Sequence, residues 1–205
     1  YGATSSTNSR YINDPNLRPE DSLTREFTVE RDTGRGLWRA TLFFEDSRDA
    51  LYSQTLFDPA ANLNISRVQN VDRIATSGLE LAFAGNEVGA DWGLRGLDAQ
   101  ASLTYANSII KANTGFVALP GDTLGRAQPN IPRWRATGLA SYRFSQQWAG
   151  TVAARYSGPQ FRTLNNADVN GFAYQGVSKF FVVDLRARWR DRKSTRLNSS
   201  HSDRS

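Results

Sequence analysis

Hydrophobic and polar residues alternate along most of the chain before Arg190. Residues 133–143 show the pattern most clearly, with apolar residues at every second position: Trp134, Ala136, Gly138, Ala140 and Tyr142. A period of two is typical of a β-strand with one apolar face and one mostly polar face. The pattern predicts seven strands, at residues 23–31, 37–57, 67–84, 97–110, 133–143, 148–156 and 181–190.

In three of these strands the apolar face has an aromatic residue at each end and smaller residues between. The pairs are Trp134 and Tyr142, Trp148 and Tyr156, and Phe181 and Trp189. Eight strand residues at ~3.3 Å each span roughly 26 Å, or about 20 Å along the axis of a barrel tilted by ~40°. An outer-membrane barrel has an apolar band of about 25 Å between two aromatic girdles. We therefore predict a membrane-interface girdle of Trp38, Tyr105, Trp134, Tyr142, Trp148, Tyr156, Phe181 and Trp189.

The connections between the predicted strands differ in length. Those at 32–36 and 144–147 are short, that at 85–96 is intermediate, and the long polar ones are 58–66, 111–132 and 157–179. Loops this long are unusual in compact soluble domains, whereas outer-membrane barrels have short turns at one end and long loops at the other. The predicted fold class is all-β: an antiparallel transmembrane β-barrel, of which this chain contains about seven strands.

The composition excludes several kinds of site. The chain has no cysteine, and its only histidine is His201, which excludes disulfides, thiolate metal sites and histidine-based triads or metal clusters. The net charge is +5, but the basic residues are spread along alternating strands. We therefore expect a solvated strand face and no nucleic-acid partner. No apolar run approaches the ~18 residues of a transmembrane helix, which leaves a β-barrel open.

The strand pattern stops at Arg190, and residues 191–205 have no periodicity. Residues 191–201, DRKSTRLNSSH, resemble the translation of a common sequencing-library adapter. We therefore predict a partial barrel at 1–190 and a non-native or disordered tail at 191–205. Without this tail, which has four basic and two acidic residues, the net charge falls from +5 to +3 and His201 is no longer a candidate for any site.

Five segments resemble, in order, motifs of the TonB-dependent receptors. They are NDPNLRPE at 13–20, LFFED at 42–46, NVDRIATSGLE at 70–80, PNIPRW at 129–134 and VDLR at 183–186. The resemblance implies a 22-stranded outer-membrane barrel filled by an N-terminal plug, which lies outside this sequence. It also implies TonB-energised uptake of a scarce nutrient such as a ferric siderophore. The implied partners are outer-membrane lipid, TonB acting through the plug, and the ferric siderophore or a similar small ligand.

The resemblance places ligand contacts on the long loops. Aromatic and cationic side chains suit a ferric chelate or a similar anion, and the candidates are Phe116, Arg126, Phe161, Arg162, Phe172 and Tyr174. Alternatively, these residues only order the loops. Two other functions remain open: a soluble all-β carbohydrate-binding module, whose packed core would also place aromatic residues on one strand face, and a porin-like barrel without a plug.

Candidates for catalysis or metal binding have simpler interpretations. Gly34 and Gly36 suggest a phosphate loop, but Arg39 stands where the third glycine of G-x-G-x-x-G belongs, so we predict a hairpin turn. Two other groups qualify by residue type: the carboxylate pairs Asp46 with Asp49 and Glu26 with Glu80, and a possible Ca²⁺ set of Asn165, Asn166 and Asp168. Solvated lumen or loop residues explain both groups. We predict no enzyme activity, no metal site and no cofactor.

Overall fold

The computed structural model describes residues 9–12, 14–58, 60–115, 123–167 and 177–190. These residues form one eight-stranded sheet and one turn of 3₁₀-helix, η1 (Ala90–Trp92). The strands are β1 (Ser9–Tyr11), β2 (Asp21–Asp32), β3 (Gly36–Asp58), β4 (Leu63–Gly85), β5 (Leu97–Ala112), β6 (Trp134–Arg143), β7 (Trp148–Ser157) and β8 (Phe180–Trp189). Strands β2 to β8 follow one another in the sheet in chain order, all antiparallel, and the sheet is open.

The predicted all-β antiparallel class and all seven predicted strands are confirmed. The expected loop at 58–66 is wrong in extent, because β3 continues to Asp58 and β4 begins at Leu63. Thr55 and Ser66 pair there, and their hydroxyl oxygens lie 2.6 Å apart. Backbone pairing does not depend on side-chain polarity, so the β3–β4 ladder extends over residues 63–66, where the polar composition favoured a loop. Among the described residues, no helix is long and apolar enough to cross a membrane.

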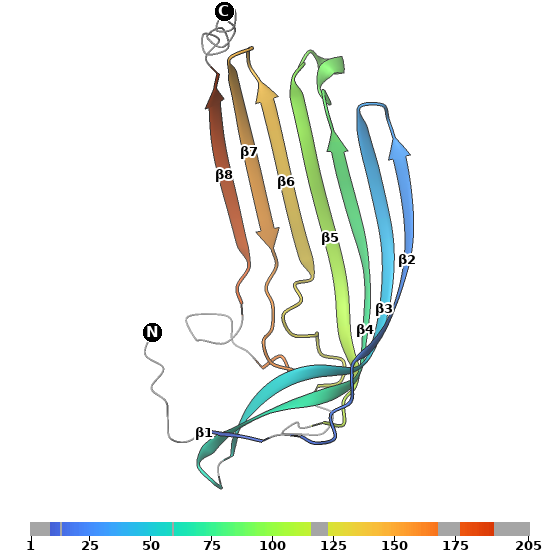
Figure 1. Ribbon diagram of the computed structural model, residues 1–205, viewed down its shortest axis with the longest axis vertical. Coiled ribbons are helices and arrows are strands. Elements are labelled where there is room, and N and C mark those ends of the chain that lie inside the picture. Colours follow the sequence, from blue (N-terminus) through green and yellow to red (C-terminus); the bar gives the residue numbers. More distant parts are fainter. Residues whose placement is uncertain (1–8, 13, 59, 116–122, 168–176, 191–205) are drawn as a thin grey trace, which may run out of the picture.

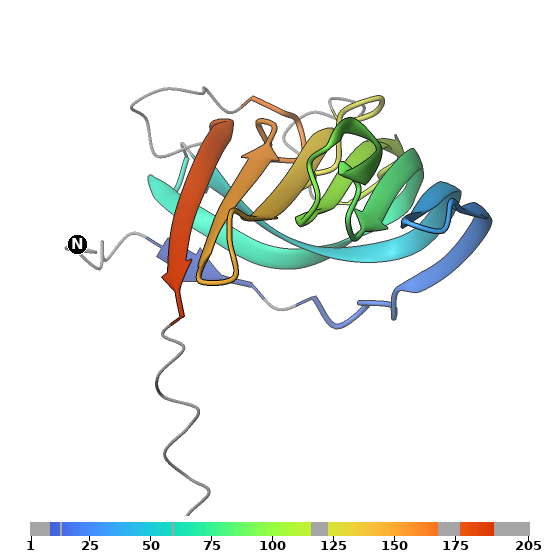
Figure 2. The same ribbon diagram turned by 90° about the horizontal axis from the view of Figure 1, so that it is seen from above.

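The sheet has two different ends (Figure 1). The β2–β3, β4–β5 and β6–β7 connections gather at one end, at the top of the figure, and the long connections lie at the other. At the long-loop end β3 and β4 continue past β5 as a bent hairpin, which turns toward the side of the sheet on which β8 lies (Figure 1 and Figure 2). Where the hairpin bends, Asp49 has a φ of 54°, and Lys111 has no partner in the β4–β5 pairing register. Such irregularities locally bend a sheet.

The register places the apolar positions of neighbouring strands side by side. Tyr105 is opposite Trp134, and Trp148 is opposite Trp189, so that one face of β2 to β8 is continuously apolar. This face is exposed: Leu185 is 81% accessible, and no described residue forms a second layer over it. A soluble sandwich would cover such a face, whereas a membrane barrel presents it to lipid.

The opposite face is polar and cross-linked by hydroxyl groups. The Thr28 and Thr41 hydroxyl oxygens lie 2.9 Å apart, and those of Ser102 and Thr137 lie 2.7 Å apart. Such cross-strand pairs reinforce the register set by the backbone. The buried apolar core lies at the long-loop end and consists of Ala50, Val71, Ile74, Ile110 and Leu164.

The turn between β2 and β3 confirms the predicted hairpin at Gly34 and Gly36. Gly34 has a φ of 77°, which is costly for residues with a Cβ. Its amide donates to Oδ1 of Asp32 at 2.7 Å, and the Thr33 amide donates to the Gly36 carbonyl at 2.9 Å. The glycines therefore serve the turn.

Candidate functional site

The long-loop end of the sheet is an ordered assembly of three chain segments. The bent β3–β4 hairpin contributes Tyr52, whose hydroxyl accepts a hydrogen bond from Nε2 of Gln128 at 2.7 Å. The hydroxyl of Ser108, on β5, donates to Oε1 of the same glutamine. Leu164, in the connection after β7, is 2% exposed and belongs to the apolar core at this end. The hairpin therefore contacts both long connections.

Asn166 fastens the two long connections to each other. Its Oδ1 accepts from the Ala127 amide at 2.7 Å, and its Nδ2 donates to the Ala127 carbonyl at 2.9 Å. The Asn130 amide donates to the Phe161 carbonyl at 2.8 Å. Asn166 has a φ of 55°, a conformation that asparagine adopts more readily than most residues. These bonds hold residues 123–130 against residues 161–166.

Three of the six predicted ligand-binding residues lie in this assembly. Arg126 and Arg162 are exposed and Phe161 is half-buried, each next to a residue that joins the two connections. The other three, Phe116, Phe172 and Tyr174, lie outside the described residues. The structure thus brings the described candidates into the same loop assembly, and their contact with a ligand stays a prediction.

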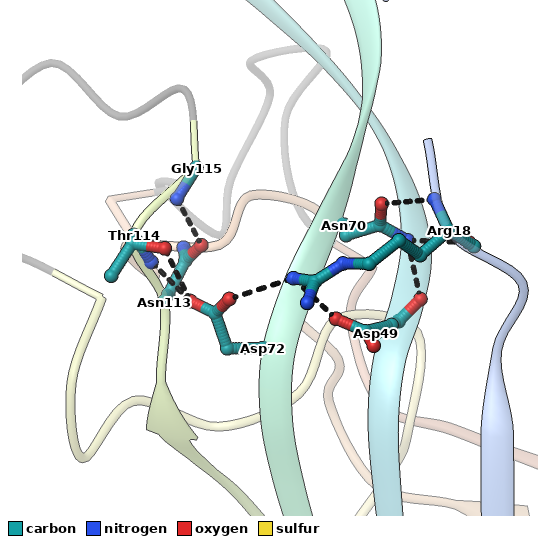
Figure 3. Close-up of polar contacts among 7 residues, drawn as sticks. All are labelled: Arg18, Asp49, Asn70, Asp72, Asn113, Thr114 and Gly115. Atoms are coloured by element: carbon teal, nitrogen blue, oxygen red, sulfur yellow. Dashed lines mark hydrogen bonds and ion pairs between the residues drawn. The ribbon is translucent and has the colours of Figure 1, made fainter. Parts of the chain in front are cut away.

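A polar cluster that the sequence did not reveal joins the segment before β2 to the bent hairpin (Figure 3). Arg18 forms ion pairs with Asp49 at 2.7 Å and with Asp72 at 3.4 Å. Oδ1 of Asn70 accepts from the Arg18 amide at 2.8 Å, and Nδ2 of Asn70 donates to the Arg18 carbonyl at 2.9 Å. Asp72 also accepts from the amide and the hydroxyl of Thr114, the latter at 2.8 Å. The segments NDPNLRPE and NVDRIATSGLE, singled out separately in the sequence, meet here.

We expect Asn70→Asp to loosen this cluster. The new carboxylate still accepts from the Arg18 amide but cannot donate to the carbonyls of Arg18 and Asp49, which Nδ2 of Asn70 reaches at 2.9 Å and 2.6 Å. Loss of these bonds should cost about 1–2 kcal/mol, roughly a 5- to 30-fold change in local opening. Hydrogen exchange at the Arg18 amide, in the complete protein, should accelerate by that factor.

The matched control is Asn64→Asp, because Asn64 is exposed on the same strand and makes no side-chain hydrogen bond with a described residue. It should leave exchange at Arg18 unchanged. Equal protection of Arg18 in both variants would show that Asn70 does not hold the segment.

Several of the other residues considered for chemistry make structural contacts. Asp46 binds Arg73 through two hydrogen bonds of 2.8 Å and 2.7 Å, and Asp49 binds Arg18. Glu26 and Glu80 are on the polar face but are not paired across neighbouring strands. Oδ1 of Asn165 accepts from the Ala167 amide at 3.1 Å, and Asp168 lies outside the described residues. Within the described part of the chain, no three His, Cys, Asp or Glu residues form a potential metal site.

The polar face of β6 to β8 carries a series of arginines. Arg155 forms a long ion pair of 3.6 Å with Asp184, and both side chains are 62% exposed. Arg135, Arg186 and Arg188 form no ion pair with a described residue. This part of the polar face therefore has a surplus of positive charge.

The eight residues of the predicted girdle all lie on the apolar face. Tyr105, Trp134, Tyr156 and Phe181 lie toward the long-loop end, and Trp38, Tyr142, Trp148 and Trp189 lie toward the short-turn end. The ring centroids of Tyr105 and Trp134 are 4.8 Å apart, and those of Trp38 and Phe83 are 4.4 Å apart. Residence at a membrane interface stays a prediction for these side chains.

The short-turn end is held by an ionic network around Glu87. Its Oε2 accepts from the Gly96 amide at 2.7 Å, and its Oε1 pairs with Nη2 of Arg143 at 2.5 Å. Arg143 also binds Asp98 at 2.8 Å. The hydrogen bond from Gly96, followed by that from Arg143, holds the pKa of Glu87 below its ordinary value of 4.5.

We expect Glu87→Gln to remove a pH-dependent contribution to stability. Because the pKa is lowered on folding, the charged Glu87 stabilises the folded state above pH 4.5, and this contribution is lost as the pH falls through the folded pKa. The urea midpoint of the wild type should exceed that of the variant at pH 7, and the difference should shrink below pH 4.5. The control is Asp91→Asn, which removes an exposed ion pair with Arg35 and should change the midpoint little. A difference that persists unchanged at pH 3 would contradict this role of the Glu87 charge.

The comparisons with known proteins agree with this architecture. The family model "TonB dependent receptor-like, beta-barrel" matches residues 1–198. No curated protein sequence matches the chain.

Similar solved structures include two transporters and a siderophore receptor. The copper transporter OprC has a TM-score of 0.61 and 18% identity, over 87% of this chain and 24% of that chain. The ferric citrate transporter FecA has a TM-score of 0.63 and 19% identity, over 82% and 23%. The siderophore receptor PiuA from Acinetobacter baumannii has a TM-score of 0.60 and 18% identity, over 85% and 22%. At these identities the likeness shows the fold.

The chain spans about a quarter of the length of these receptors. The family match covers most of the chain, in agreement with the open sheet, its exposed apolar face and its two unlike ends. The chain therefore belongs to the TonB-dependent receptors and forms part of their β-barrel, which lies in the outer membrane of Gram-negative bacteria.

Proposed function

We propose that the receptor containing this segment imports a ferric siderophore with energy supplied through TonB. The observation that carries the proposal is the surplus of arginine on the polar face of β6 to β8, which in a receptor barrel faces the lumen. A ferric chelate surrounds its iron with oxygen ligands and is commonly anionic. Arg135, Arg186 and Arg188 offer it charge-assisted hydrogen bonds. The ferric citrate and siderophore receptors among the similar structures support this substrate class.

The two ends of the sheet have different tasks in this proposal. The loop assembly at the long-loop end captures the ligand, with Arg126, Phe161 and Arg162 as contacts. The bent β3–β4 hairpin holds the connections in place, because Tyr52 and the core around Leu164 attach them to it. TonB acts through a plug domain, whose movement opens the passage along the arginines. This part of the proposal rests on the family to which the chain belongs.

Uptake measurements in cells test the substrate class. The complete receptor is expressed in a strain without its own siderophore receptors, and import of iron-55 citrate, iron-55 enterobactin and copper-64 is measured with and without TonB. We expect import of at least one ferric chelate, and this import should disappear when TonB is absent. Import of copper alone would overturn the siderophore proposal, and import that persists without TonB would favour the porin-like alternative.

We expect the double substitution Arg186→Ala and Arg188→Ala to lower uptake of the imported chelate about tenfold or more. Each lost charge-assisted bond costs about 1.5–3 kcal/mol, and 1.4 kcal/mol corresponds to a factor of ten. The control is Arg95→Ala, an exposed arginine at the short-turn end, which should leave uptake unchanged at equal receptor abundance. Unchanged uptake in the double variant would remove the arginines from the proposed path.

A further inference from the structure

The lipid-facing surface has a basic hollow at the boundary between its apolar and polar parts. One register row joins Leu42, Leu79, Tyr105 and Trp134 across β3 to β6. The next row toward the long loops contains Phe44, Ser77 and Asn107. The apolar face therefore ends here, on the side where the barrel meets the outer leaflet of the membrane.

The hollow forms because small side chains lie between larger ones. Ala75 and Ser77 on β4 make its floor, and Phe44 on β3 and Ile109 on β5 stand on its two sides. Arg25 and Lys111 line it from β2 and β5, and the acidic residues Glu45 and Asp46 line it from β3. Lys111 is the residue left out of the β4–β5 register, so it lines the hollow at a local irregularity of the sheet.

Positive charge gathers around the hollow in excess of what the local acids neutralise. Asp46 is bound by Arg73 through two hydrogen bonds, of 2.8 Å and 2.7 Å, which satisfies both of its oxygens. The positive charges of Arg25 and Arg48 also interact with this carboxylate. Neither Arg25 nor Lys111 forms an ion pair with any residue that the structure describes.

An anionic lipid at this position gains both electrostatic attraction to the basic side chains and contact of its acyl chains with apolar side chains. Arginine and lysine near a membrane surface attract anionic headgroups, by about 1 kcal/mol per basic residue. Their aliphatic stems lie along apolar surface while the charged ends reach the headgroup level. Directly below the hollow, Phe27, Leu42 and Leu79 continue the apolar face along which acyl chains can lie.

We propose that this hollow binds a phosphate group on the headgroup of an anionic lipid of the outer leaflet. Arg25 and Lys111 hold the phosphate, Arg48 and Arg73 supply further positive charge, and the acyl chains lie against Phe44 and the apolar face below it. The site fixes one lipid at the seam of β2 to β5. The proposal rests on the membership of the family and is independent of the transported ligand.

Lipid binding by the complete receptor in detergent tests the proposal. Native mass spectrometry measures the affinity for bis-phosphorylated lipid A, for the same lipid without its phosphates, and for inorganic phosphate alone. We expect saturable binding of the phosphorylated lipid and at least tenfold weaker binding of the other two. Equal affinity for the dephosphorylated lipid would overturn the role of phosphate. Equal affinity for inorganic phosphate would overturn the assignment to a lipid.

A matched pair of variants locates the site. Arg25→Gln with Lys111→Gln should weaken binding of the phosphorylated lipid at least tenfold. Arg31→Gln with Arg95→Gln removes the same charge near the short-turn end, with Arg31 on the same strand and face as Arg25, and should change it less than twofold. Equal losses in the two double variants would overturn the location.

If Arg25→Gln with Lys111→Gln does not fold, two further measurements decide. Binding by the wild type should fall steeply between 50 mM and 500 mM NaCl, because the contacts are ionic and partly exposed. The single variant Lys111→Gln, at an exposed position, should weaken binding severalfold. Salt-independent binding, or full affinity of the Lys111→Gln variant, would overturn the proposal.

Discussion

Replacement of Gly78 by alanine is expected to impair folding of the receptor barrel. A Cβ at Gly78 would overlap both the ring of Phe43, its partner on β3, and the carbonyl oxygen of Tyr105, its neighbour on β5. The ring can turn aside, but the carbonyl belongs to the β4–β5 ladder and can move only with the strand. Overpacking of this kind costs roughly 1–3 kcal/mol. The measurements are the free energy of unfolding in detergent and the fraction of receptor that migrates as folded barrel without heating.

The matched control for Gly78→Ala is Gly138→Ala on β6, where a Cβ would have no atom within 4 Å. The control should change the free energy of unfolding by no more than about 0.5 kcal/mol. In Gly78→Ala with Phe43→Leu, part of the loss should be recovered, and the remainder reports the clash with the Tyr105 carbonyl. Equal stability of Gly78→Ala and Gly138→Ala would show that the space above Gly78 is not needed.

Leu185→Arg is expected to destabilise the barrel in the membrane by about 2–4 kcal/mol, because it places a charge at the middle of the lipid-facing surface. Leu185 is 81% exposed and lies midway between Phe181 and Trp189 on the apolar face of β8. Burial inside the protein does not hold this leucine in place, so the cost arises from the lipid. The free energy of unfolding should be measured in lipid vesicles and again in detergent micelles.

Leu139→Arg is the control for Leu185→Arg. Leu139 lies on the opposite, polar face of β6, opposite Gln100 and Ala153, and is 39% exposed. The same substitution there meets a polar environment and should cost less than half as much. Equal costs at the two positions would contradict the assignment of the two faces.

The family match and the exposed apolar face answer the main question left open by the sequence. Apolar residues at every second position, with aromatic residues at both ends, are compatible with a soluble sandwich core as well as with a membrane face. Trp134, Trp148 and Trp189 are between 46% and 56% exposed, as expected of a lipid-facing surface. The soluble carbohydrate-binding module therefore has no support, while the identity of the ligand stays a proposal. The tail at 191–205 lies outside the described residues, and its non-native origin stays a prediction.

The sequence by itself determined the strands and their two faces. A strand points successive side chains to opposite sides, so the alternation from Trp134 to Tyr142 identifies both the element and its apolar face without knowledge of any partner strand. The short connection with two glycines located the turn at Gly34, where a positive φ favours glycine. Both features depend on short stretches of chain, and both are confirmed.

Only the tertiary structure decided how the long-loop end is built. The parallel pairing of β1 with β4 and the joining of Arg18 to Asn70 and Asp72 connect residues more than 50 positions apart. Beyond the membrane both faces of a strand can be polar, so periodicity no longer indicates where strands end or what covers them. Three residues such as β1 are too few to show a period at all. These contacts are set by the geometry of the surrounding sheet and not by local pattern, which is why the three-dimensional arrangement was needed to find them.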